Sequence, residues 1–254
     1  MELSAISVLS LMAIIALGCY IQTNTGFAFA LIVMSLGGAS GALSVPQLAL
    51  VVSFLSLVNS TTALQSSFRD IDKRILLHLF SGIIPGALIG VWALYQLSAS
   101  DQSQLKILLG LSVLGSALLL IKKPVQIRQR PSRVALNLSG VTAGVMGGLF
   151  STFGPPIAYS LYRHSLAVKT LLSTMLATFW LTAIMRIVMV HGLGEVDESV
   201  YWLALIGAPW IVLCTRLSQR YPPKISEQRL RQCALSLLAL SGLSLLATGL
   251  SGLG

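Results

Sequence analysis

The longest uncharged segment of the chain spans residues 3 to 68, where no Asp, Glu, Lys or Arg occurs. A second uncharged run covers residues 134 to 162. A membrane-spanning helix needs about 20 predominantly apolar residues. Only 10% of the whole chain is charged, against about 25% in a typical soluble domain. These features predict an all-α polytopic membrane protein with no stretch polar enough to form a separate soluble domain.

Apolar runs between polar loops indicate where the spans lie. The basic linker 122–133 divides the chain into a first half, residues 1–121, and a second half, residues 134–254. The span at 200–215 is short for a full crossing, so we expect it to begin or end among the lipid headgroups. The predicted spans are 3–22, 46–66, 75–97, 104–121, 170–190, 200–215 and 230–250, with shorter apolar pieces at 27–38, 134–150 and 157–162.

The basic residues are concentrated in a few loops. Of 17 Lys and Arg, 15 fall in the segments 69–74, 122–133, 163–169 and 216–231. Cytoplasmic loops collect Lys and Arg, so these segments are predicted to face the cytoplasm. Asp101, Glu195, Asp197 and Glu198 lie in the other loops. We therefore interpret the net charge of +9 as a signal of topology in a lipid bilayer, and not of a nucleic-acid partner.

The position of the basic loops fixes the parity of the crossings. Basic segments flank 134–162 on both sides, so this run must form a hairpin, either re-entrant or crossing twice. The same reasoning in the first half places both termini outside. The predicted fold is thus two halves of inverted topology, each a broken-helix hairpin plus three transmembrane helices. Many secondary transporters have this architecture.

Each hairpin has a polar break, QTNTG at 22–26 and STFGPP at 151–156. Proline is favoured in the first turn of a helix, and the hydroxyls nearby suit helix capping. Helix N-termini carry free N–H groups and a positive dipole end, which favour an anion. At an offset of 128 residues, Thr23 pairs with Ser151 and Gly26 with Gly154. We expect the two N-termini to form one anion site; the alternative is that both breaks are packing turns.

Arg186 is the one charge clearly inside a predicted span, and such a residue is a functional candidate. The alternative is that its long stem reaches the headgroups near His191. The predicted substrate-binding residues are Thr23, Asn24, Thr25, Gly26, Ser151, Thr152, Gly154, Pro155, Pro156 and Arg186.

Glycines recur at intervals of four in two of the predicted spans. Gly82, Gly86 and Gly90 form one series and Gly144 and Gly148 another, with Pro85 inside the first. Small residues at this spacing let membrane helices approach closely. We predict that these glycines are packing positions.

The second break lies within GGLFSTFGPPIAYSLYR, residues 147–163, which resembles the signature "G-L-F-G-T-S-G-P-P-L-V-x-Y-L" of the sulfite exporter TauE/SafE family. The first break, TGFAFALIVMSL at 25–36, resembles the "T-G-F-G-F-A-L-I" of some members. Ala28 stands where glycine is common, and Phe153 where a small residue is common. The resemblance implies transport of sulfite, organosulfonates or related anions across a bacterial inner membrane.

The sequence therefore predicts a secondary transporter and not an enzyme. A scaffold subunit without substrate is the main alternative, and an intramembrane enzyme is disfavoured because no span contains Asp or Glu. The separated Cys19, Cys214 and Cys233 indicate no metal site, and no cofactor is expected. A proton, a sodium ion or no ion could be coupled, and both a monomer and a homodimer are compatible with the sequence.

Overall fold

The structure, a computed structural model, describes residues 5–41, 43–65, 67–98, 102–121, 129–193, 196–221 and 227–251. Within these ranges the chain forms ten α-helices and one short 3-10 turn, and contains no strand. The helices are α1 Ala5–Thr25, α2 Phe29–Ser40, α3 Val45–Leu64, α4 Lys73–Ser98, α5 Gln102–Ile121, α6 Arg133–Phe150, α7 Gly154–Tyr162, α8 Val168–His191, α9 Glu198–Arg220 and α10 Glu227–Ser251; the turn is η1 Phe68–Asp70.

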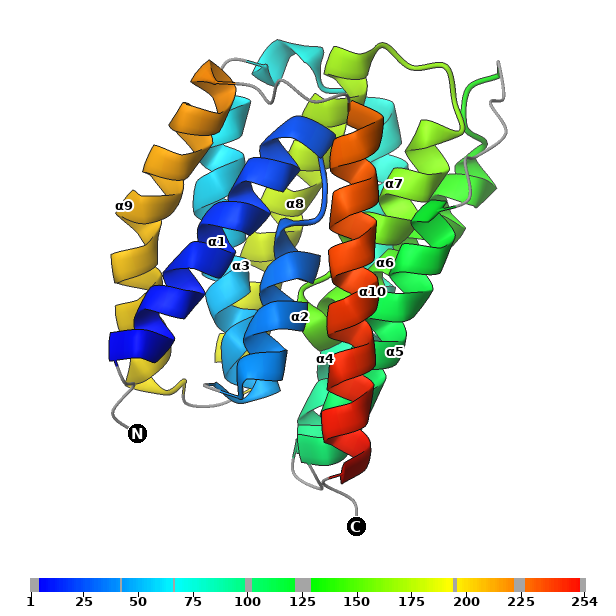
Figure 1. Cartoon of the computed structure of the whole chain (residues 1–254). Coiled ribbons are helices and arrows are strands. Elements are labelled where there is room, and N and C mark those ends of the chain that lie inside the picture. The colour runs from blue at the N-terminus through cyan, green and yellow to red at the C-terminus, as the bar shows by residue number, and fades with distance from the viewer. Residues whose placement is uncertain are drawn as a thin grey trace.

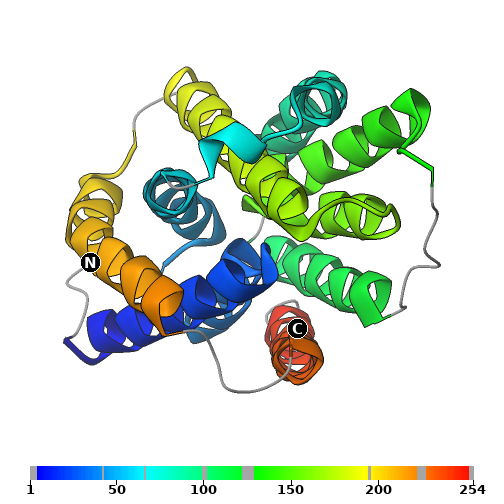
Figure 2. The ribbon, with the colours of Figure 1, turned by 90° about the horizontal axis from the view of Figure 1, so that it is seen from above.

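In the described part of the chain, seven helices are long and apolar enough to cross a membrane: α1, α3, α4, α5, α8, α9 and α10. The prediction of a multi-pass, all-helical membrane protein is confirmed. Figure 1 shows these helices side by side in one bundle, with the start of α1 and the end of α10 at the same end of it. Seen from above, α3 is enclosed by α1, α8 and α9 (Figure 2). It is also the most buried of the seven spans.

Helix α9 corrects the prediction of a short span at 200–215, since it runs for 23 residues from Glu198 to Arg220. The prediction ended the span at the first basic residue after the apolar run. Exposed arginines can still belong to the last turns of a helix, because their long side chains reach out of the lipid. At the other end, Asp197 caps the helix, because its carboxylate accepts a hydrogen bond from Ser199 N–H at 2.8 Å. The hydrogen bonds from Ser199 hold the pKa of the Asp197 carboxyl below its ordinary value.

Two hairpins enter the bundle from opposite ends. Helix α1 runs through most of the height of the bundle. Helix α2, which is only 12 residues long, returns to the end from which α1 started (Figure 1). Helix α6 enters from the other end, and the nine-residue α7 returns there. Each hairpin therefore joins a longer helix to a shorter one through a break inside the bundle.

The two breaks have the same backbone geometry at their first residue. Gly26 and Ser151 both adopt positive φ, 76° and 60°, and both donate their N–H to the carbonyl four residues earlier at 2.7 Å. This is a common way for a helix to end. Gly26 thus corresponds to Ser151, an offset of 125 residues. The predicted pairing of Thr23 with Ser151 and of Gly26 with Gly154, at an offset of 128, is wrong because the left-handed residue, and not the residue type, sets the register.

The glycine series lie at one helix–helix contact, between α4 and α6. A Cβ atom on Gly144 would lie 2.5 Å from the carbonyl oxygen of Ile83, and one on Gly148 would lie 2.5 Å from that of Ala87. Gly82, Gly86 and Gly90 face α6 in the same way, and Gly140 extends the second series by one turn. The prediction that these glycines are packing positions is confirmed, and the contact joins the two halves of the chain.

We expect Gly144→Val to disrupt this contact, because its new side chain would meet backbone that cannot rotate away. Overpacking typically costs about 1–3 kcal/mol, and a backbone clash belongs at the upper end. Gly115→Val in α5 is the matched control, since a Cβ built there would meet no described atom within 4 Å apart from the backbone of its own helix. Thermal unfolding of the two purified variants in detergent checks this. Equal midpoints for the two variants would contradict the proposed packing role.

Candidate functional site

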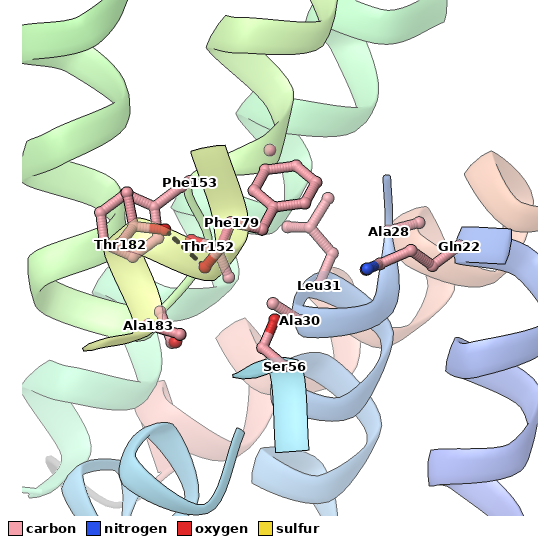
Figure 3. A pocket seen from close by; sticks show the side chains of 12 residues that line it. Gln22, Ala28, Ala30, Leu31, Ser56, Thr152, Phe153, Phe179, Thr182 and Ala183 are labelled. Atoms are coloured by element: carbon pink, nitrogen blue, oxygen red, sulfur yellow. Dashed lines mark hydrogen bonds between the residues drawn. The ribbon is translucent and has the colours of Figure 1, made fainter. Parts of the chain in front are cut away.

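A small cavity lies between the two breaks. Its volume of about 20 Å³ is enough for roughly one water molecule. Figure 3 shows its walls, which come from α1, α2, α3, α8 and both breaks. The lining residues are Gln22, Ala28, Ala30, Leu31, Ser56, Ser151, Thr152, Phe153, Gly154, Phe179, Thr182 and Ala183. The structure thus brings residues of the two breaks together around one small cavity.

Two helix N-termini border the cavity. Ala30 and Leu31 lie in the first turn of α2, and Gly154 begins α7. First-turn N–H groups have no acceptor within their own helix, and the positive end of the dipole lies there. Because Pro155 and Pro156 carry no N–H, α7 offers fewer donors than α2. The arrangement suits a small anion, with α2 as the main source of backbone donors.

The hydroxyls of the second break do not cap α7, contrary to the prediction. Ser151 forms a hydrogen bond with Ser53 of α3, with 3.0 Å between the hydroxyl oxygens. Thr152 donates its hydroxyl to the carbonyl of Met146 at 3.3 Å. Both residues nevertheless line the cavity. Thr182 lies on the same wall and donates to the carbonyl of Phe179 at 3.1 Å (Figure 3).

The polar residues of the first break also differ from the prediction. Thr23, Asn24 and Thr25 form the last turn of α1, where each side chain donates to the carbonyl four residues earlier at 2.7–2.9 Å. Short polar side chains often form such bonds near helix ends. They therefore end α1 and do not cap α2, whose Phe29 N–H donates to the side chain of Gln22 instead.

A larger vestibule of about 440 Å³ lies beside the small cavity, toward the end of the bundle where α1 finishes and α8 begins. Lys169 lines it, with a side chain that is 72% exposed and paired with Asp70 at 3.2 Å. The vestibule is lined by Gln22, Thr23, Asn24, Gly26, Ala63, Ser67, Lys169, Leu172, Ser173, Leu176, Ser218 and Gln219. Three of the predicted site residues thus border the vestibule instead of the cavity.

The prolines of α7 occupy the first helical turn, where proline is favoured. Pro155 and Pro156 are buried in the first turn of the helix, and neither lines the cavity. At the other end of α7, the Tyr162 hydroxyl donates to the carbonyl of Thr25 at 2.7 Å, and its ring packs edge-on against Phe27. This contact holds α7 against the first break.

Arg186 is fully buried, so the alternative that it reaches the headgroups is wrong. Its Nε donates to the carbonyls of Gly147 and Gly148 at 3.1 and 3.3 Å, at the negative end of the α6 dipole. Its Nη1 donates to Ser53 at 3.2 Å, and Ser53 bonds to Ser151. Arg186 therefore lies behind the cavity wall and reaches the cavity through two hydroxyls.

The charge of Arg186 has no acidic partner in the described part of the chain. No described carboxylate lies within 4.0 Å of its guanidinium, and the Nη2 atom is buried without a hydrogen bond. The carbonyls at the end of α6 offset part of this charge, and the remainder raises the electrostatic potential around the guanidinium. The site next to it is therefore suited to negative charge.

The polar residues Gln22, Ser53, Ser56 and Thr182 of this region were not predicted, nor were the apolar residues that line the cavity. Gln22 begins the polar segment QTNTG, so the signal for it was present in the sequence. The other three are single hydroxyls in apolar helices, which are common where membrane helices pack.

Comparisons with known proteins agree with this picture. Residues 11–245 match the family model of the sulfite exporter TauE/SafE family. The chain is 33% identical over 243 residues to a probable sulfite/organosulfonate exporter TauE of Cupriavidus necator, covering 96% of this chain and 95% of that protein. It is 27% identical over 184 residues to a probable inner membrane transporter protein TsaS of Comamonas testosteroni, covering 70% and 74%. No solved structure matches the chain.

Proposed function

The chain belongs to the sulfite exporter TauE/SafE family, and on this premise we propose that it is a secondary transporter of sulfite, an organosulfonate or a similar small anion across the bacterial inner membrane. The observation that carries the proposal is the cavity between the breaks. Two helix N-termini border it, an arginine without an acidic partner among the described residues lies behind it, and none of the described residues that line it is acidic. Such surroundings favour an anion over a cation or a neutral solute.

The anion binds between the breaks through backbone N–H groups of α2 and α7 and through the hydroxyl of Ser56, since the Thr152 hydroxyl donates to Met146. Arg186 acts through its field, since it does not line the cavity. With a volume of about 20 Å³, the cavity is too small for a sulfonate in this conformation, whereas the vestibule beside it holds about 440 Å³. The helices around the breaks must therefore separate for an anion to enter.

The pattern of helix packing supports two halves of inverted topology. If α1–α5 correspond to α6–α10, each packed pair should have a counterpart. The most extensive contacts follow this rule: α1–α9 matches α6–α4, α3–α9 matches α8–α4, α2–α10 matches α7–α5, α2–α3 matches α7–α8, and α3–α8 and α5–α10 are their own counterparts. The weaker pairs α2–α5, α4–α5, α1–α10, α3–α6 and α3–α5 have no counterpart of similar extent. Alternating access would then consist of one half rocking against the other around the breaks.

The same arrangement supports an orientation in the membrane. The helix ends next to the basic segments 69–74, 163–169 and 216–231 lie at one end of the bundle (Figure 1). The start of α1 and the end of α10 lie at the opposite end. By the positive-inside rule, the vestibule opens to the cytoplasm and both termini are external.

The proposed function is tested by thermal unfolding of the detergent-purified protein with a panel of anions at fixed ionic strength. The panel holds sulfite, methanesulfonate, taurine, sulfoacetate, sulfate and acetate, with chloride as the reference. A ligand that binds only the folded state stabilises it by about 2.7 kcal/mol at one hundred times its dissociation constant. We expect a selective rise in midpoint with sulfite or a sulfonate. A protein that no anion stabilises would favour the alternative of a scaffold subunit.

A further inference from the structure

The side-chain amide of Gln22 has a fixed orientation. Its Oε1 accepts a hydrogen bond from the N–H of Phe29, the first residue of α2, at 3.2 Å. A backbone N–H can only donate, so the oxygen and not the nitrogen must face it. The Nε2 group therefore points away from Phe29.

The Nε2 group of Gln22 is an unpaired donor at the centre of the protein. The side chain is 3% exposed, and Nε2 has no hydrogen-bond partner among the described residues. Figure 3 shows this nitrogen directed into the cavity, with the Ser56 hydroxyl of α3 pointing into the same space. Buried donors are almost always paired, so one held without a partner calls for a ligand.

Gln22 also occupies the boundary between the two spaces. Among the described residues it alone lines both the cavity of about 20 Å³ and the vestibule of about 440 Å³. An anion passing from the vestibule to the breaks would have to move past this side chain.

We propose that Gln22 recognises the transported oxyanion, donating Nε2–H to one of its oxygens, and that the same side chain closes the passage between vestibule and cavity. This assignment rests on the proposed function. Among the residues that the structure describes, no Lys, Arg, His, Asp or Glu lines the cavity, so the recognising groups are neutral donors. Such donors select a sulfite or sulfonate group by the positions of its oxygen atoms. One amide thus orders the start of α2 with its oxygen and binds substrate with its nitrogen.

The test uses Gln22→Glu, which keeps an oxygen acceptor for Phe29 but replaces the donor. The probe is methanesulfonate, whose charge does not change between about pH 5 and pH 8, where a buried Glu titrates. At pH 8 the charged carboxylate repels the anion, and at pH 5 the protonated carboxyl donates a hydrogen bond again. We expect affinity to fall about 10- to 100-fold at pH 8 and to recover at pH 5, while the unsubstituted protein shows no such change.

Two further variants complete the test, with sulfite at pH 8 as a second probe. Gln22→Met fills the same space without a donor and should bind both anions weakly at either pH. Gln65→Glu is the matched control, because it makes the same change at an exposed residue after α3 and should bind normally. Binding unchanged by both Gln22 variants would overturn the assignment. The assignment would also be overturned if Gln22→Glu lost the same affinity at pH 5 and pH 8 and unfolded at a lower temperature, because Gln22 would then only cap α2.

Failure of this inference is distinguishable from failure of the proposed function. If the unsubstituted protein binds neither sulfite nor any sulfonate, the proposed function has failed. If it binds them and the Gln22 variants bind equally well, only the role of Gln22 has failed.

Discussion

Gly154→Leu is expected to abolish anion transport while the protein stays folded in the membrane. Gly154 begins α7 and lines the cavity between the breaks. A Cβ atom there would lie 3.5 Å from Cβ of Phe27 and 3.6 Å from the Phe179 ring, which is ordinary contact. The remaining leucine atoms have only about 20 Å³ to enter. They would occupy the place of the anion and hold the two breaks apart.

The size of the effect can be measured as sulfite or sulfonate flux in proteoliposomes. We expect a loss of about 100-fold or more, which corresponds to about 3 kcal/mol. Gly154→Ala is the matched control, since its Cβ makes only ordinary contacts, and it should retain most of the flux. Thermal unfolding without ligand separates a blocked site from a damaged fold. Normal flux through the leucine variant would show that the anion does not bind between the breaks.

Apolar patterning was sufficient to predict the spans and the hairpins. Lengths of apolar runs and the positions of basic loops depend on transfer to lipid, which is a local property of each segment. The glycine series was also predictable, because a four-residue spacing of small residues can be recognised in the sequence of a single helix. The length of α9 was underestimated, because the helix continues past the apolar run through residues that are charged or polar.

The register of the first break was not predictable, because backbone conformation and not residue type decides it. Serine at 151 adopts the left-handed conformation that glycine adopts at 26. Ala28, which stands where glycine is common in the family signature, also has a positive φ of 95°. Left-handed geometry is unfavourable for both residues, so the surrounding packing must hold it. Phe153 fits because its ring covers Gly147, which has no side chain.

The site itself was predicted in outline and not in its contacts. Glycine and proline indicated where α7 begins. The free N–H groups and the positive dipole end of a helix N-terminus then predicted an anion site there. Which polar side chains face the cavity depends on the rotation of α1, α3 and α8 about their axes. In a helix that is apolar all round, the sequence carries no periodic signal for that rotation. Gln22 belongs to the same polar segment as Thr23 and Asn24, but that Gln22 faces the cavity while the other two do not could not be predicted.

Arg186→Met should weaken anion binding by removing the positive charge behind the cavity. The path from the guanidinium to the cavity wall has two steps, 3.2 Å to Ser53 and 3.0 Å on to Ser151. An anion near Ser151 would lie roughly 8 Å from the charge, and at an effective dielectric constant of about 20 their attraction is ~2 kcal/mol. We therefore expect affinity for sulfite or a sulfonate to fall roughly 30-fold in titrations followed by thermal unfolding.

Arg186→Lys separates this charge from the hydrogen bonds of the guanidinium. Lysine keeps the positive charge but lacks the planar fork that holds the carbonyls of Gly147 and Gly148 and the hydroxyl of Ser53 at once. Both variants should unfold at a lower temperature without ligand, because buried acceptors lose donors. Only the methionine variant should show the roughly 30-fold loss of anion affinity, because lysine keeps the positive charge. If methionine and lysine lowered stability equally and left anion affinity unchanged, Arg186 would only fasten the end of α6, and the anion would be held by the helix N-termini and Gln22 alone.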